Sequence, residues 1–318
     1  MGRIAILGSY NLDLAAAVPR LPAPGETLRA TGLLRGHGGK GSNQAVAAAR
    51  AGARVRFAGC IGDDEAGRAA RLLWQAEGIE DGAVLRPGTP TGVAMILVDR
   101  TGENQIVVAA GANDAVREAD GTAAGALAAG DVALAQLEIP LAATLAFLTA
   151  ARAAGAITVL NAAPAQAALP AALLAATDVL VVNEGEAAML CGLPADSPAA
   201  VTGALLAQRG AGTVLVTAGA RGAFLFAGDG TACHQPSAAV QVVDSTGAGD
   251  AFTGAFVAAM ARGATAADAL ADGVAAGALA CTRAGAVAGL PDRVAIAALR
   301  RTLPDARPTQ APDAAVAP

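Results

Sequence analysis

The 318-residue chain is poor in the side chains that several common kinds of site require. It has two histidines, His37 and His234, so a histidine-based triad or a histidine-rich metal site is not expected. Its four cysteines are far apart and form no Cys-x-x-Cys pair, which speaks against a disulfide framework and a zinc site. Only 3% of residues are aromatic, whereas alanine and glycine abound, so helices are expected to pack through small side chains.

Positive charge is also scarce. The formal net charge is −5 and no run of basic residues occurs, which argues against a nucleic-acid partner. Long uncharged apolar runs are absent: Met260 to Cys281 is interrupted by Arg262, Asp268 and Asp272, so a membrane partner is not expected either. The first residues read as a buried strand and not as a signal peptide. We therefore predict a soluble cytoplasmic protein.

With 54% hydrophobic residues the chain can bury a large core. Short apolar runs alternate with alanine- and leucine-rich helical patterns, which favours an α/β fold with a mostly parallel sheet covered on both faces. In such sheets ligands gather at the carboxyl ends of the strands. The predicted strands are Ile4–Leu7, Val55–Ala58, Val132–Gln136, Thr158–Leu160, Val179–Val182 and Thr213–Thr217, and the predicted helices Ser42–Arg50, Ala66–Glu77, Leu141–Ala154 and Glu184–Cys191.

Two segments interrupt this alternation. Leu14–Gly36 has several prolines and no helical period, and Thr91–Ala110 reads as two strands, Gly92–Val98 and Gln105–Ala109. Together they predict a small extra β-sheet, either a lid over a site or an edge decoration. The tail, residues 304–318, is rich in proline and alanine and is predicted to be disordered.

The most informative motif lies in the last third of the chain. A polar, β-rich stretch, Val240–Asp244, runs through Ser245-Thr246 into Gly247-Ala248-Gly249-Asp250, and a helical pattern follows. Glycines let a ligand approach the backbone, and a helix N-terminus favours a phosphate. An aspartate beside such a site is a candidate general base for phosphoryl transfer. The alternative is that Asp250 merely caps the helix.

A second motif is Gly36-His37-Gly38-Gly39-Lys40-Gly41-Ser42-Asn43-Gln44, which holds the only lysine of the chain. It matches the dinucleotide fingerprint G-x-G-x-x-G, with Asp63 at a suitable distance, so a nicotinamide site is one hypothesis. However, no clean buried strand precedes it. It also fails the P-loop pattern, because Gly41 follows Lys40 where serine or threonine should stand.

Further polar residues follow predicted strands. Asn11 and Asp13 are two apart in an extended segment, so both side chains point the same way and can grip neighbouring sugar hydroxyls; the alternative is an Asx turn. Glu138 follows a strand and either reaches the same crevice or is a solvated loop acid. Asn183 and Glu186 can hold a hydrated Mg²⁺ or can cap a helix. Thr217–Gly222 is a nucleotide loop or a plain turn.

The order of these motifs resembles the ribokinase-like carbohydrate kinases, the PfkB family, over nearly the whole chain. The most specific fragment is Asp244-Ser245-Thr246-Gly247-Ala248-Gly249-Asp250, and the Gly-Gly-Lys-Gly-x-Asn-Gln form points to ribose-specific members. Other matching fragments are Gly8–Asp13, Pro24–Thr27, Gly38–Ala45, Gly59–Asp64, Thr91–Ala94, Gly111–Asn113, Gln136–Glu138, Asn161–Ala165 and Asn183–Glu186.

The resemblance implies a ribokinase-like three-layer α/β/α sandwich over residues 1–303, with a β-sheet lid from about 14–36 and 91–110 that also forms a homodimer interface. It implies transfer of the γ-phosphate of ATP to the primary 5-hydroxyl of D-ribose. Kinases of 2-deoxyribose or another small sugar, and a non-catalytic sugar-binding regulatory protein, are the alternatives. The implied base is Asp250, with an anion hole at Gly247, Ala248, Gly249 and the N–H of Asp250. The implied sugar contacts are Asn11, Asp13, Gly39, Lys40, Asn43 and Glu138.

The resemblance also implies cofactor contacts. Mg²⁺ is expected at Asn183 and Glu186. K⁺ is expected at Asp244, Thr246, Ala280, Arg283, Gly285 and Gly289, mostly through backbone carbonyls; the family commonly has serine where this chain has Gly289, so altered K⁺ activation is our hypothesis. ATP is expected to contact Asn183, Thr217, Ala218, Gly219, Ala220, Arg221, Gly222, Gly249, Asp250 and Val274.

Overall fold

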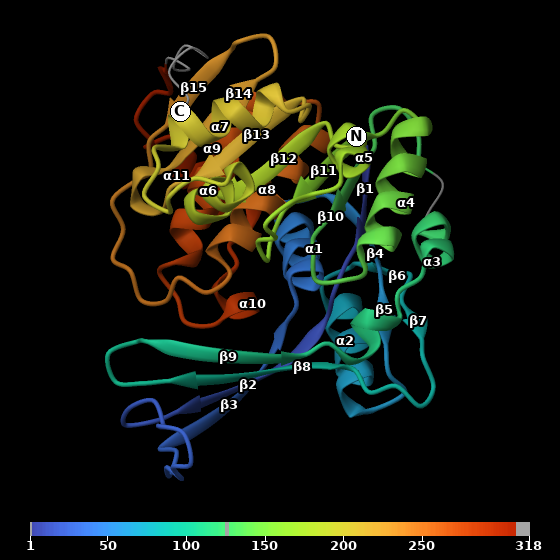
Figure 1. The fold of residues 1–318 in the computed structure, drawn as a ribbon, viewed down its shortest axis with the longest axis vertical. Helices are drawn as coiled ribbons and strands as arrows, with labels where there is room; N and C mark the ends of the chain where they lie inside the picture. Colours follow the sequence, from blue (N-terminus) through green and yellow to red (C-terminus); the bar gives the residue numbers. More distant parts are fainter. Residues whose placement is uncertain (1, 125–126, 310–318) are drawn as a thin grey trace.

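The computed structural model describes residues 2–124 and 127–309, and its centre is one large twisted sheet (Figure 1). The strand order is β16-β15-β14-β13-β12-β11-β10-β1-β4-β6. The strands from β13 to β6 are parallel, whereas β14, β15 and β16 are antiparallel and form one edge. The carboxyl ends of the parallel strands therefore lie along a single edge of the sheet, as the sequence predicted.

All six predicted strands are present in this sheet, with boundaries within one residue. The three antiparallel edge strands, β14, β15 and β16, were not predicted. The strands are β1 Arg3–Leu7, β4 Arg54–Ala58, β6 Glu80–Asp81, β10 Val132–Ala135, β11 Ile157–Asn161, β12 Val179–Asn183, β13 Thr213–Thr217, β14 Ala223–Ala227, β15 Ala232–Gln235 and β16 Arg307–Pro308.

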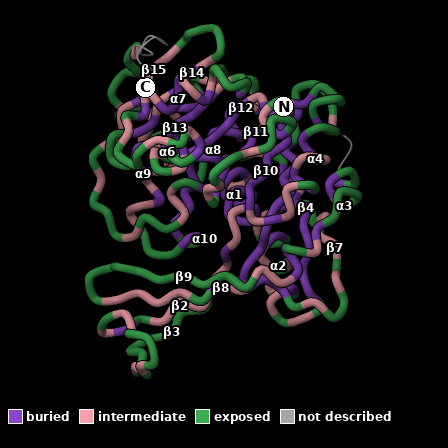
Figure 2. Tube along the Cα trace, in the orientation of Figure 1, coloured by how far each residue is buried: buried purple, intermediate pink, exposed green. Residues whose placement is uncertain are grey.

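Helices cover both faces of the sheet and bury two hydrophobic clusters. In β1, Ile4 and Ile6 face one cluster and Ala5 and Leu7 the other, as alternation along a strand requires. Figure 2 shows the sheet as the buried centre. One layer holds α1 Lys40–Arg50, α2 Glu65–Ala76, α8 Ala248–Ala261, α9 Ala266–Ala280 and α11 Arg293–Arg300; the other holds α3 Glu118–Ala123, α4 Leu141–Ala153, α5 Ala171–Ala175, α6 Glu184–Cys191 and α7 Ala199–Gln208.

The alanine- and glycine-rich composition allows very close helix packing. Helices α1 and α8 meet at Gly254, where an added Cβ would lie 2.4 Å from Cβ of Ala47 and 2.8 Å from the carbonyl oxygen of Gln44. No residue with a side chain fits this crossing without displacing a helix. The contact matters because both helices begin at the carboxyl edge of the sheet.

The predicted small sheet is present and projects from the main body at the bottom of Figure 1. Its order is β3-β2-β8-β9, with β2 and β8 parallel and the two outer strands antiparallel. The strands are β2 Asn11–Ala17, β3 Gly32–Gly38, β8 Gly92–Val98 and β9 Asn104–Ala109. Short elements complete the fold: β5 Cys60–Ile61 with β7 Val84–Leu85, η1 Gly111–Ala115, η2 Gly219–Arg221 and α10 Ala286–Gly289.

Two segments differ from the sequence prediction. The stretch Val240–Asp244 is not a strand: its partner is the end of α9, through bonds from the N–H groups of Val243 and Asp244 to the carbonyl of Cys281 at 2.7 and 3.2 Å. In the tail predicted to be disordered, β16 pairs with β15 and Thr309 donates to the carbonyl of Ala232. Residues 310–318 of that tail lie outside the described residues. Within the described part, no helix is long and apolar enough to cross a membrane.

Candidate active site

The predicted site residues converge where the N-termini of α1, α6 and α8 meet the carboxyl ends of β11, β12 and β13. A polar cavity of about 250 Å³ lies there. Lys40, Asn183, Glu186, Gly249 and Asp250, which are up to 210 positions apart in the sequence (250 − 40), all line it. The sequence motifs, weak when taken singly, therefore form one site.

The start of α8 has the form of an anion site. Gly247, with φ +79°, is the N-cap, and no side chain caps the helix. The alternative that Asp250 is the capping residue is therefore wrong, because Asp250 lies within the first turn, three residues after the N-cap. In the described ranges the N–H groups of Gly247, Gly249 and Asp250 have no hydrogen-bond acceptor, whereas that of Ala248 donates to Ser245 at 3.2 Å. The first three are thus available to an anion.

The carboxylate of Asp250 is buried and held from α1. Nδ2 of Asn43 donates to its Oδ2 at 3.0 Å, and Nε2 of Gln44 donates to its Oδ1 at 2.9 Å. Burial raises the pKa of Asp250, while the Lys40 ammonium and these two bonds oppose the rise. The arrangement gives a proton acceptor in a fixed orientation with an elevated pKa, as general-base catalysis requires.

A buried amide chain supports this acceptor, and sequence reasoning gave its members no role. Nε2 of Gln44 also donates to Oδ1 of Asn161 at 2.9 Å, and Oε1 of Gln44 accepts from Nε2 of Gln136 at 2.6 Å. Gln44 and Gln136 are fully buried. Gln136, which ends an otherwise apolar predicted strand, was the available signal, since buried polar groups require partners.

The predicted sugar-gripping side chains lie beside Asp250 at the base of the lid. Asn11 is oriented by Nδ2 of Asn113, which donates to its Oδ1 at 2.8 Å. Glu138 is not a solvated loop acid: its Oε2 accepts from Oγ of Ser9 at 2.5 Å and from the N–H of Lys40 at 2.9 Å. Asn11 is buried and Glu138 is partly buried.

Asp13 lies in β2, as the extended segment predicted, so the Asx-turn alternative is wrong. Burial raises its pKa to about 6, and the negative charges of Glu138 and Asp250 add to the rise. Gly38 lies directly under this carboxylate, since an added Cβ would be 2.1 Å from Oδ1 of Asp13. Gly39 has φ +85°, and an added Cβ there would lie 2.6 Å from Cα of Tyr10 and 2.8 Å from the backbone nitrogen of Asn11. Only glycine fits at Gly39, whereas a side chain at Gly38 would displace the Asp13 carboxylate.

Lys40 is the first residue of α1 and lines the cavity with Asp250. It has no ion pair among the residues that the structure describes, yet its charge opposes the upward pKa shifts of both Asp250 and Glu186. A strand, β3, does precede it, but β3 is a largely exposed lid strand and no part of the parallel sheet. The dinucleotide fingerprint therefore lacks its structural context.

Asn183 and Glu186 form a capping box on α6. Oδ1 of Asn183 accepts from the N–H of Glu186, and Oε2 of Glu186 accepts from the N–H of Asn183, both at 2.8 Å. Both residues line the polar cavity, and burial raises the pKa of Glu186. The described residues contain no group of three or more His, Cys, Asp or Glu side chains suited to a metal ion. A metal here would need water or phosphate as further ligands.

A second cavity of about 900 Å³ adjoins the first and is mainly apolar. The two share Asn183, Thr217, Ser245 and Gly249. Of the predicted nucleotide contacts, Thr217, Gly219, Ala220, Gly222 and Val274 line the larger cavity, but Ala218 and Arg221 do not. Ala218 is buried, and the Arg221 side chain forms an ion pair with Glu184.

The predicted cation loop is assembled next to the start of α8. Oδ1 of Asp244 accepts from the N–H of Thr246 at 2.9 Å and its Oδ2 from the N–H of Gly285 at 2.8 Å. An added Cβ at Gly289 would lie 3.0 Å from the carbonyl oxygen of Ala280 and 3.3 Å from that of Arg283. Two carbonyl oxygens thus converge where a side chain is missing, and carbonyl oxygen suits a hard cation.

Comparisons with known proteins agree with this geometry. The family model described as "pfkB family carbohydrate kinase" matches residues 1–293. Ribokinase of Haemophilus influenzae is 39% identical over 298 residues, 91% of this chain and 95% of that protein. Deoxyribokinase of Salmonella typhi is 36% identical over 258 residues, 80% of this chain and 84% of that protein.

A solved structure is similar as well. Arabidopsis thaliana ribokinase, solved as a complex with ribose and ATP, superposes with a TM-score of 0.82 at 31% identity, covering 95% of this chain and 99% of that one. The chain described here belongs to the PfkB family of carbohydrate kinases.

The raised pKa of Asp13 has a consequence for stability. Because its pKa is higher in the folded than in the unfolded chain, its contribution to stability is present below about pH 4 and is lost as the pH rises through about 6. We expect Asp13→Asn to be more stable than wild type above pH 7, by up to about 3 kcal/mol, with the advantage vanishing near pH 4. Urea unfolding between pH 4 and 8 measures it. A difference that does not change with pH would contradict the assignment.

Proposed function

We propose that the protein is an ATP-dependent kinase that phosphorylates the primary 5-hydroxyl of D-ribose, giving D-ribose 5-phosphate and ADP. The observation that carries the proposal is the position of Asp250. Its buried, doubly hydrogen-bonded carboxylate lies at the start of α8, between the sugar-gripping residues and the larger cavity. A base between an alcohol site and a phosphate site suits phosphoryl transfer.

In this mechanism Asp250 takes the proton of the sugar hydroxyl as the oxygen attacks the γ-phosphorus. The new O–P bond forms while the bond from that phosphorus to the β,γ-bridging oxygen breaks, and ADP leaves. The free N–H groups of Gly247, Gly249 and Asp250 stabilise the charge on the transferred group. Lys40, which has no ion pair among the described residues, supplies the only lysine charge. The proposed anion hole is thus the predicted set without Ala248, because the N–H of Ala248 is engaged by Ser245.

The acceptor sugar is held by the cluster at the lid base. Asn11, Asp13 and Glu138 offer amide and carboxylate oxygens to ring hydroxyls. Among the described residues, Oδ1 of Asn43 is buried without a hydrogen-bond partner, so it can accept a further hydroxyl. Support for ribose comes from the similarity to ribokinases, and the second candidate, 2-deoxyribose, is favoured by the similarity to a deoxyribokinase. A coupled assay over ribose, 2-deoxyribose, fructose and nucleosides tests the choice.

ATP is proposed to occupy the larger cavity, with its base near Val274 and its phosphates toward Gly249. Mg²⁺ would be held by phosphate oxygens and by water bound to Glu186, since Asn183 and Glu186 already satisfy one another in the capping box. Bound in that way, Mg²⁺ supplies neutralisation of phosphate charge. The residues present therefore fit a hydrated ion and not a direct protein cage.

K⁺ is proposed to lie between the carbonyls of Ala280 and Arg283 near Gly289. The Asp244 carboxylate organises both neighbouring turns, through Thr246 and Gly285, so an ion there would steady the loop that precedes Gly247. Serine at residue 289 would add an oxygen ligand at this point, but the crowding at its Cβ requires a small shift of the Ala280 carbonyl.

The lid is proposed to pair two copies of the chain. Its strands β3, β8 and β9 expose large apolar side chains, which a monomer would leave in water. The exposed residues are Leu33, Leu34, Met95, Ile106, Val107 and Val108.

The base assignment predicts the effect of one isosteric change. Asp250→Asn removes the proton acceptor, so the turnover number in ATP-dependent sugar phosphorylation should fall by about 10²–10⁴. Calorimetric sugar binding should persist, which shows that the protein remains folded. Asp114→Asn, an exposed carboxylate, is the control and should be unaffected. An undiminished rate for Asp250→Asn would refute the base assignment, whereas the absence of any rate in wild type would refute the kinase activity and favour a non-catalytic binder.

The cation site predicts a second outcome. Wild type should be activated less by K⁺ than Gly289→Ser, because the serine hydroxyl adds a ligand. Initial rates over a K⁺ titration with Na⁺ as the balancing ion measure this difference. Equal activation of both proteins would reject it.

The lid proposal predicts dissociation. Leu33→Glu combined with Val107→Glu places charges in the apolar surface and should convert a dimer to a monomer in sedimentation velocity. The matched change of exposed residues outside the lid, Leu72→Glu with Val294→Glu, should leave the dimer intact. A wild-type protein that sediments as a monomer would exclude the dimer.

A further inference from the structure

A cavity of about 320 Å³ lies outside the active site, at the opposite ends of the helices that build it. Helix α8 has 14 residues and so is about 20 Å long. Its first turn holds Asp250, and Arg262 at its C-cap lines this second cavity. Ala51, the C-cap of α1, lines it too.

The lining is strongly basic in a chain of net charge −5. Four of its side chains are arginines, against a single aspartate, Asp272. The arginines are Arg262 from the end of α8, Arg293 and Arg300 from α11, and Arg301 just after it. A surplus of positive charge in an acidic protein is unusual for a purely structural feature, because like charges repel.

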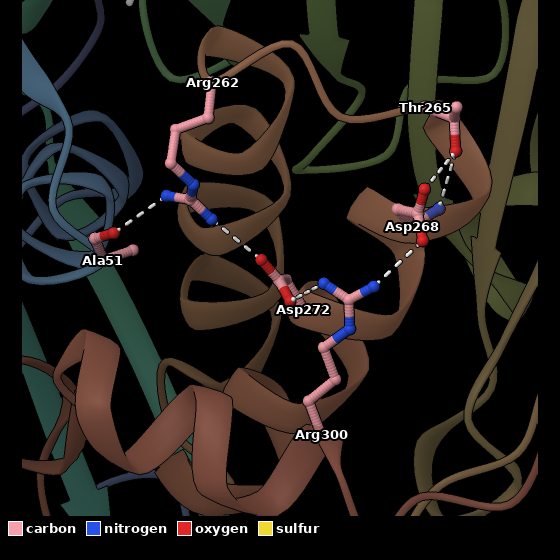
Figure 3. Close-up of polar contacts among 6 residues, drawn as sticks. All are labelled: Ala51, Arg262, Thr265, Asp268, Asp272 and Arg300. Carbon is pink, nitrogen blue, oxygen red and sulfur yellow. Dashed lines mark hydrogen bonds and ion pairs between the residues drawn. The ribbon is translucent and has the colours of Figure 1, made fainter.

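Two of the arginines are fixed by acids, as Figure 3 shows. Nη2 of Arg262 donates to Oδ2 of Asp272 at 2.8 Å, and Nη1 of Arg300 donates to its Oδ1 at 2.9 Å. Nη2 of Arg300 also donates to Asp268 at 3.0 Å, and Thr265 holds that carboxylate at 2.8 Å. Both guanidinium groups point at the buried Asp272 from opposite sides.

These bonds leave donors unused. A guanidinium carries five N–H bonds. Arg262 uses one further nitrogen, Nη1, for the carbonyl of Ala51 at 3.0 Å, and within the described residues the Nε–H groups of Arg262 and Arg300 have no partner. The acids therefore orient these two side chains without saturating them.

The other two arginines have no ion pair in the described part of the chain. Arg293 stands in the first turn of α11, where the helix dipole disfavours a cation, and its stem packs on Gly52. Arg301 is exposed at the end of the same helix. Arg262 and Arg300 already connect the ends of α1 and α8 with α9 and α11 through their hydrogen bonds. This structural role does not need Arg293 or Arg301. Two charges remain, which equals the charge of a phosphate dianion.

We propose that this cavity binds a phosphate dianion, free or as the phosphate group of a small phosphorylated metabolite. Arg293 and Arg301 neutralise the anion, and the pre-oriented Arg262 and Arg300 offer it their spare N–H donors. Burial lowers the pKa of Arg262, and the positive charges of Arg293 and Arg300 lower it further; an anion relieves this repulsion. The inference is independent of the proposed sugar and of the assigned base.

The test is calorimetric titration of inorganic phosphate into the whole protein, with the active site first saturated by Mg²⁺, ribose and a non-hydrolysable ATP analogue. One phosphate should bind per chain. Arg293→Gln combined with Arg301→Gln should weaken it by about a hundredfold, about tenfold for each charge-assisted bond removed. These residues are exposed, so the fold should persist, and circular dichroism with an unchanged sugar KM checks this.

The matched control is Arg29→Gln combined with Arg68→Gln, which removes the same charge from exposed positions elsewhere. It should bind phosphate as wild type does. No binding to wild type, equal binding to all three proteins, or equal loss in the control would overturn the proposal. Repeating the titration with ribose 5-phosphate identifies the source: arginine-dependent binding that is tighter than that of inorganic phosphate assigns the site to phosphorylated metabolites, and equal binding assigns it to the free ion.

Discussion

The hydrogen bonds from Asn43 and Gln44 to Asp250 are the interaction on which the rest of the site depends. A carboxylate buried to 8% exposure would be strongly disfavoured without partners. Two amide donors on consecutive residues of α1 engage its two oxygens, and Gln136 and Asn161 hold Gln44 in turn. The position of the base is therefore determined by the packing of α1 against α8 and the sheet, and not by α8 alone.

Electrostatics shape the same region. The negative charges of Glu138 and Asp250 add to the burial that raises the pKa of Asp13. Burial and Glu138 also raise the pKa of Asp250, and Lys40 is the cation that opposes this rise. Such crowding lowers the stability of the free protein, as is common where function requires like charges close together. Ligands that bind these carboxylates in the folded chain stabilise it, by an amount set by their concentration and affinity.

Much of the fold could be predicted from the sequence, because long-range order in a parallel sheet follows from buried apolar runs such as Ile4–Leu7 and Val179–Val182. The lid strand Gly92–Val98 was placed correctly for the same reason. Val240–Asp244 was misread because β-branched residues favour a strand only where a neighbouring strand is available, and here the end of α9 takes its N–H groups. The edge strand β16 was missed since its partner, β15, is some 70 residues away.

The site could be assembled from motif order but not in its finer detail. Glu138, Asp13 and Lys40 fall where the motifs indicated, yet the fully buried glutamines received no role because only burial reveals that they need partners. The departure at Ala248 follows from a turn geometry that closes its N–H onto Ser245, and no sequence pattern encodes that bond. Local hydrogen-bond choices of this kind lie beyond pattern reasoning.

Gly254 gives the active site an unexpected point of fragility. At this residue α1 and α8 lie too close together for a methyl group. The close approach allowed by Gly254, about one helical turn after Asp250, therefore sets the distance from the Asp250 carboxylate to its amide donors on α1. An alanine there would alter no reacting group and would remove no hydrogen-bonding side chain. It would nevertheless push α8, which carries Asp250, away from α1, which carries the amide donors Asn43 and Gln44. A substitution of Gly254 would therefore be judged harmless if only the catalytic and binding residues were compared between related sequences.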